Sequence, residues 1–113
     1  MTAISERHVI DSVADALHFI SYYHPQDFIR ALSAAWQTEE SPAARDAMTQ
    51  ILVNSRMAAI GHRPICQDTG VANITARIGV KARLDWDRPL QEIVDDAVRR
   101  AYLADENPLR ASV

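Results

Sequence analysis

The sequence of 113 residues is poor in cysteine and glycine, and it has no long run of apolar residues. Its one cysteine, Cys66, excludes an internal disulfide and any metal site built only from this chain's thiolates. No apolar run approaches the roughly 18 residues of a membrane span. The N-terminus lacks the basic and then apolar layout of a signal peptide. We therefore expect a cytoplasmic protein that does not enter the membrane.

Runs of basic residues are also absent. The densest pair is Arg99-Arg100, and the net charge is −3. This balance argues against a phosphate-neutralising patch for nucleic acid. The composition is 48% hydrophobic and 24% charged, as in ordinary globular proteins, and supplies enough apolar material for a core. The length suggests one domain, or part of one, over residues 1–113.

Four segments have the apolar spacing of amphipathic helices. Pro25, Pro42 and Pro89 each suit the first turn of a helix. Ser41 can cap the third helix, and Gly61 is placed to end it. The predicted helices are 4–23, 25–37, 42–61, and a fourth that starts at Pro89 and ends before Pro108. The clearest apolar stripe, in the fourth, consists of Leu90, Ile93, Val94, Ala97, Val98, Ala101 and Tyr102.

The pattern between the third and fourth helices has a period of two. Apolar residues alternate with polar ones from Val71 to Val80, as in a half-buried strand, and Gly79 permits a bulge or turn. One strand cannot satisfy its own backbone hydrogen bonds. Either a second strand near Lys81–Leu84 forms a short hairpin, or chain absent from this sequence completes the sheet. Both interpretations predict an α+β fold with a mainly helical N-terminal region, and the second predicts an incomplete domain.

The loop Arg63-Pro-Ile-Cys-Gln-Asp-Thr-Gly70 lies between the third helix and the predicted strand, a place where function concentrates. It presents a thiol, an amide, a carboxylate and a hydroxyl at consecutive positions. Cys66 by itself is compatible with a buried small hydrophobe, a metal ligand or a nucleophile. His62 is four residues from Cys66, but Pro64 disfavours a shared helix face, so a thiol nucleophile lacks an evident base.

The string Pro64-Ile-Cys-Gln-Asp-Thr-Gly70 resembles the N-terminal cluster motif of the class I, iron–sulfur-dependent fumarases. The related two-subunit tartrate dehydratases share this motif. Asn54-Ser55-Arg56 and the ending Asn107-Pro-Leu-Arg110 also have counterparts in that family. The resemblance implies that Cys66 is one of three thiolates around a [4Fe–4S] cluster. It also implies a homo-oligomeric lyase of the tricarboxylic acid cycle that interconverts fumarate and (S)-malate.

The resemblance assigns substrate contacts to three further residues. Gln67 would donate an amide hydrogen bond, and Asp68 would accept one from the hydroxyl of a dicarboxylic hydroxy acid. Arg110 would bind a substrate carboxylate with its planar fork. The residues alone also allow a solvated loop amide, a turn carboxylate and an exposed arginine near a chain end.

The family's other two cluster cysteines and its catalytic base belong to later segments. We therefore expect an N-terminal fragment that works with the remaining segments of a parent chain and has neither cluster nor activity alone. Two alternatives stay open. One is the α subunit of a tartrate dehydratase-like enzyme, and the other is a non-catalytic helical interaction module with a buried Cys66. Asp95-Asp96 and Arg99-Arg100 are interpreted as i,i+4 ion pairs on the last helix.

Overall fold

The computed structural model describes residues 2–66 and 71–105, and it divides into two compact units. The first unit comprises Met1–Phe19 and Asp68–Val113, and the second comprises Ile20–Gln67. Helix α1 (Glu6–Tyr22) begins in the first unit, and its last turn belongs to the second. Each unit is described by itself below.

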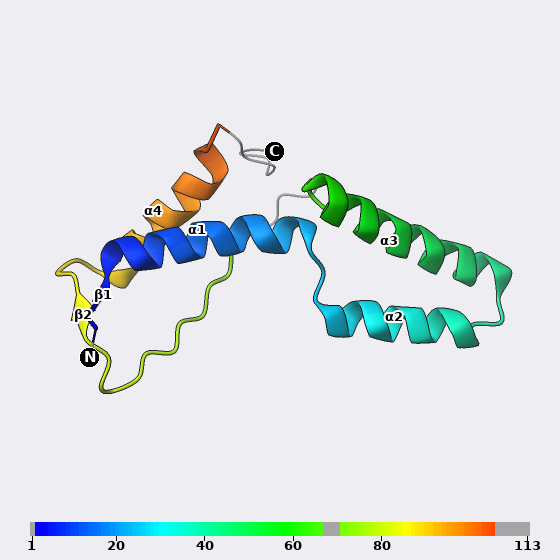
Figure 1. Ribbon diagram of the computed structural model, residues 1–113, viewed down its shortest axis with the longest axis horizontal. Coiled ribbons are helices and arrows are strands. Elements are labelled where there is room, and N and C mark those ends of the chain that lie inside the picture. The colour runs from blue at the N-terminus through cyan, green and yellow to red at the C-terminus, as the bar shows by residue number, and fades with distance from the viewer. Residues whose placement is uncertain (1, 67–70, 106–113) are drawn as a thin grey trace. The chain divides into compact units, whose positions relative to one another are not determined.

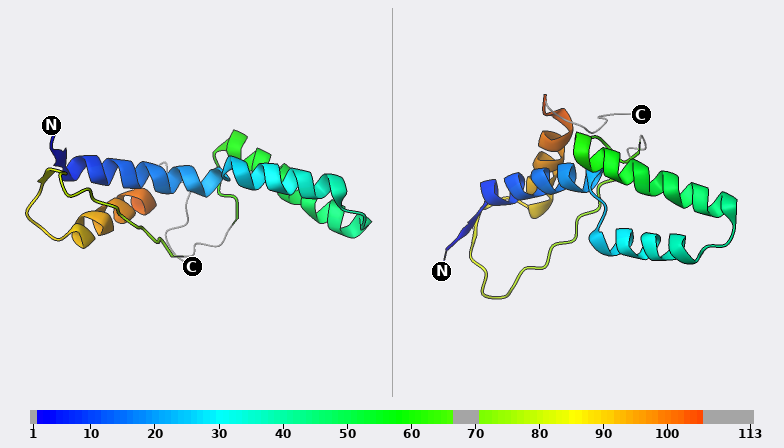
Figure 2. Two further views of the ribbon diagram at one scale, coloured as in Figure 1. Left: turned by 90° about the horizontal axis from the view of Figure 1, so that it is seen from below. Right: turned by 45° about the vertical axis from the view of Figure 1, so that its right-hand side comes forward.

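The second unit is built on a hairpin of two helices, α2 (Gln26–Thr38) and α3 (Pro42–Gly61), which lie side by side in Figures 1 and 2. The Ser41 side chain accepts a hydrogen bond from the amide of Ala44, as predicted for a cap. Trp36 on α2 donates from its indole nitrogen to the Thr49 hydroxyl on α3 at 2.8 Å. The proline and serine signals therefore placed both helices to within one residue: Pro42 is the first residue of α3, and Pro25 directly precedes α2.

The core of the first unit lies along helix α4 (Leu90–Leu103), which Figure 1 shows against α1. The predicted apolar stripe is confirmed, because Ile93, Ala97 and Ala101 have no exposed surface. Ala14 is the buried residue of α1. His18 of α1 donates from Nε2 to the carbonyl oxygen of Ala101 at 2.7 Å, which links the two helices.

The sheet of this unit is a parallel pair of two-residue strands, β1 (Ile4–Ser5) and β2 (Leu84–Asp85). The α+β fold class is thereby confirmed. The strand predicted from Val71 to Val80 is wrong, because this segment is not assigned to a strand and most of its side chains are exposed. Within the described residues no neighbouring strand takes up its backbone groups, and an unpaired strand is not stable.

Two boundaries also differ from the prediction. The segment near Lys81–Leu84 does lead into a strand, but β2 pairs with the N-terminal β1 rather than closing a hairpin. The first helix accordingly starts at Glu6, because Ile4 and Ser5 are in β1. A turn at Gly79 is confirmed by the hydrogen bond from the amide of Ala82 to its carbonyl oxygen, 2.9 Å long.

Ion pairs around α4 follow a different pattern from the one predicted. Asp96 pairs with Arg88 at 2.7 Å and with Arg99, three residues on, at 2.8 Å. Arg88 also binds Glu6, and Arg100 binds Asp11 of α1. The i,i+4 pairing was wrong because Arg88, before α4, and Asp11, on α1, offer competing partners. In the described part of the chain, no helix has the length and apolar character needed to cross a membrane.

Candidate functional site

The chain reverses direction immediately after α3, in the loop that leads to Cys66. His62 takes the left-handed conformation, with φ 48° and ψ 49°, and its amide donates to the carbonyl oxygen of Ala58. The Arg63 amide donates to the same oxygen at 3.1 Å. Gly61, predicted to end the helix, is its last residue, but the left-handed position falls on His62. A side chain in this conformation costs about 1–2 kcal/mol, so other contacts must stabilise it.

The His62 ring has such contacts from the end of α1. It stacks on Tyr22, with ring centroids 4.6 Å apart and an interplanar angle of 12°. The Tyr23 hydroxyl lies 3.0 Å from His62 Nε2, within hydrogen-bonding distance. Aromatic pairs contribute about 0.5–1.5 kcal/mol beyond the burial of their area, which is comparable to the backbone cost. The aromatic cluster Tyr22–Tyr23–His62 therefore helps to hold the reversal in place.

Ile65 precedes Cys66, and both its backbone amide and its carbonyl oxygen form hydrogen bonds. Its amide donates to the carbonyl oxygen of Ser21 at 2.8 Å. Its own carbonyl oxygen accepts a hydrogen bond from Asn54 Nδ2, also at 2.8 Å. Ser21 is in the last turn of α1, where helical carbonyls lack partners within the helix. Two helices thus fix the backbone at the residue from which Cys66 follows.

The thiol itself lies on the surface of this loop. Cys66 is exposed, so the interpretation of a buried, purely packing cysteine is wrong. Within residues 2–66 and 71–105, no three histidine, cysteine, aspartate or glutamate side chains gather closely enough to hold a metal ion. The described residues around Cys66 therefore do not form a complete metal site by themselves. Gln67, Asp68 and Arg110 lie outside the described residues, and their roles stay predictions.

Asn54 was missed as a contact of the loop, although sequence carried a signal for it. Asparagine is a poor residue for a helix interior, because its side chain competes with the backbone for hydrogen bonds. Its neighbour Ser55 is the buried polar residue of α3, and its hydroxyl lies 2.9 Å from Nδ1 of His24. Asn54 and Ser55 thus both hydrogen-bond to segments outside α3.

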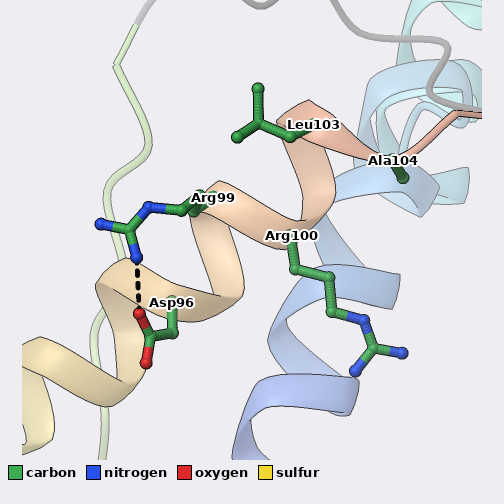
Figure 3. A pocket seen from close by; sticks show the side chains of 5 residues that line it. All are labelled: Asp96, Arg99, Arg100, Leu103 and Ala104. Carbon is green, nitrogen blue, oxygen red and sulfur yellow. Dashed lines mark hydrogen bonds and ion pairs between the residues drawn. The ribbon is translucent and has the colours of Figure 1, made fainter.

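A hollow of about 390 Å³ lies beside the last turns of α4 in the first unit (Figure 3). Arg99 and Arg100 line it and are the obvious candidates for binding a carboxylate. Arg99 is paired with Asp96, and Arg100 is paired with Asp11, so their charges are already balanced. The C-terminus of a helix also carries partial negative charge. This hollow is therefore a poor anion site.

The family of the chain follows from comparison with known proteins. The family model described as "Fumarate hydratase (Fumerase)" matches residues 10–113, which include α2, α3 and the Cys66 loop. The chain belongs to this fumarate hydratase family. The resemblance predicted from the string Pro64 to Gly70 is thereby confirmed.

A curated relative comes from Methanocaldococcus jannaschii and is named "Putative L(+)-tartrate dehydratase subunit alpha". It is 29% identical over 105 residues, which are 93% of this chain and 36% of the relative. The chain thus spans about a third of the length of this relative. Both comparisons include the loop, so Cys66 is interpreted below as a residue of a fumarate hydratase family member.

Proposed function

We propose that this chain supplies one ligand, the Cys66 thiolate, to a [4Fe–4S] cluster in a hydro-lyase that interconverts fumarate and (S)-malate. The observation that carries the proposal is the exposed Cys66 at the end of a loop held by two helices. Iron–sulfur clusters are bound by cysteine thiolates, so the donor fits. Family membership supports the reaction class.

The cluster, when bound, supplies a Lewis acid that favours departure of a hydroxyl group from the substrate. The chain's own residues bind and orient the substrate. Gln67 donates from its side-chain amide, and Asp68 accepts a hydrogen bond from the substrate hydroxyl and so orients that group. Arg110 binds a carboxylate through two parallel hydrogen bonds. Proton transfer by a positioned side chain contributes about 10²–10⁴-fold to the rate.

The remaining cluster ligands and the catalytic base come from other segments of the enzyme. One thiolate does not retain a cuboidal cluster, which takes several thiolates together. The chain alone is therefore proposed to be inactive, and the complete cytoplasmic enzyme to be a homo-oligomer.

The test separates Cys66 from Asp68 in the enzyme that contains this chain. Cys66→Ser replaces a soft thiolate with a poorly ionised hydroxyl, so iron content and activity should be lost together. Asp68→Asn is nearly isosteric and removes only the charge, so iron should stay while turnover falls by roughly 10²–10⁴-fold. Iron analysis and hydration kinetics measure the two effects.

Asp87→Asn is the matched control for loss of one carboxylate, because Asp87 is exposed in the loop before α4. It should leave both iron and turnover unchanged. A Cys66→Ser enzyme with normal iron and activity would refute the proposal. A fully active Asp68→Asn enzyme would remove only the substrate contact.

The second candidate is the α subunit of a tartrate dehydratase-like enzyme. The relative from Methanocaldococcus jannaschii favours it by its name. Assaying the enzyme with malate and with L(+)-tartrate distinguishes the two candidates, because the preferred substrate should be turned over faster. Loss of that activity in Cys66→Ser is expected for either substrate.

A further inference from the structure

We infer that Asn54 is a positioning residue for the Cys66 thiol, an inference that rests on the proposed role of Cys66 as a cluster ligand. The Asn54 side-chain amide donates to the carbonyl oxygen of Ile65 at 2.8 Å, across 11 residues of sequence. Asn54 lies within α3, so the donor is attached to a regular helix rather than to the loop.

The physical link from Asn54 to the thiol is one peptide plane. The carbonyl group of Ile65, the amide of Cys66 and the Cα atom of Cys66 lie in the same rigid plane. Holding the oxygen of that plane therefore restricts the position of Cα and the direction in which the thiol projects. The Asn54 side-chain amide therefore restricts the backbone position of Cys66 without contacting its sulfur.

Asn54 supplies the side-chain contact that, with the rest of the loop, fixes the peptide between Ile65 and Cys66. The left-handed His62 sets the reversal, and Pro64 has a φ fixed by its ring. The Ile65 amide is held by a backbone carbonyl of α1, which no substitution removes. The Ile65 oxygen accepts a hydrogen bond from the Asn54 side chain, which a substitution does remove.

This arrangement suits a cluster ligand for an energetic reason. A thiolate that must share one cluster with thiolates from other segments binds more tightly if its position is set in advance. Partners that orient a metal ligand typically change metal affinity or activity by about 10–100-fold when they are removed. Asn54 is a partner of this kind, although it acts through the backbone.

Asn54→Asp is the sharpest test, because it keeps the shape of the side chain and replaces the donor with a carboxylate oxygen facing the Ile65 carbonyl. Gln50→Glu is the matched control, one turn earlier on α3. It also changes an amide to a carboxylate, and the Gln50 amide donates to Asp46 of the same helix. Asn54→Gln restores a donor on a longer arm and should rescue part of the loss.

Two readouts are measured. In the cluster-free protein, hydrogen exchange at Ile65 should rise about three- to ten-fold for Asn54→Asp, the equilibrium equivalent of one lost hydrogen bond. Exchange within α2 should not change, which excludes general destabilisation. In the holoenzyme, the rate of iron loss to a chelator should rise about ten-fold or more. Gln50→Glu should change neither quantity.

The outcomes separate this inference from the proposed function. If Asn54→Asp behaves like Gln50→Glu in both readouts, Asn54 has no positioning role. If exchange at Ile65 rises but iron loss stays normal while Cys66→Ser loses its iron, Asn54 holds the loop without positioning the thiol, and the inference is wrong. If Cys66→Ser keeps its iron, the proposed function fails, and the inference that rests on it fails with it. A rise in exchange at Ile65 then shows only that Asn54 holds the peptide before Cys66.

Discussion

Ile93 is the largest fully buried side chain among the described residues, which makes it the most informative site for a stability measurement. The change Ile93→Ala removes three carbon atoms from a side chain with no exposed surface. Deletions of this kind cost about 2–5 kcal/mol, depending on how far the surroundings collapse into the space. Ile93 therefore tests whether α4 has the buried face that its periodicity predicts.

The neighbours of Ile93 favour the upper part of that range. The other fully buried residues along α4 are Ala97 and Ala101, each with only a methyl group. Side chains this short cannot move into a new cavity, so most of the space should stay empty. We expect a loss of about 3–4 kcal/mol. This is a large share of the roughly 5–15 kcal/mol by which a domain is stable.

Urea unfolding followed by far-ultraviolet circular dichroism measures the loss. With a slope of about 1–3 kcal/mol per molar urea, the midpoint should fall by at least about 1 M. Ile93→Val should cost only about 0.5–1.5 kcal/mol. Leu103 is 67% exposed on the same helix, so Leu103→Ala should change the free energy of unfolding by no more than about 0.5 kcal/mol. Equal midpoints for Ile93→Ala and Leu103→Ala would refute the packing described for α4.

Two further predictions concern charge and association. Arg88 holds the pKa of the Asp96 carboxyl below its ordinary value through a hydrogen bond, so this pair stabilises the fold above the unfolded pKa of about 3.9. That stability is lost as pH falls through the lower folded pKa. Asp96→Asn should therefore make the free energy of unfolding depend less on pH in the acid range. Exposed apolar side chains on α3, such as Met57 and Ile60, should drive association. Light scattering that gives a monomer at high concentration would contradict this expectation.

The helices were predictable from sequence because their signals are local. A stripe such as that of α4 and a cap such as Ser41 depend on residues within one or two turns. The strand prediction failed because pairing is not local. Alternation from Val71 to Val80 shows that a segment suits a sheet, but a partner elsewhere decides whether it joins one. The observed β1 and β2 have two residues each, too few to show any alternation.

The same contrast between local and non-local information applies to the candidate site. Cys66 was found because it stands in a continuous string, where each residue can be compared with the family at its own position. The hydrogen bonds that hold Ile65 come from Ser21 on α1 and Asn54 on α3. These two residues are far apart in the sequence, so no short motif includes both of them. What sequence does offer is an inconsistency, since Asn54 is a poor choice for the middle of a helix. A helix interior that tolerates such a residue gains something elsewhere, and here the gain is a hydrogen bond to the peptide that leads into Cys66. Polar residues of low helix propensity before a loop with a candidate ligand are therefore the places to look for contacts that hold that loop.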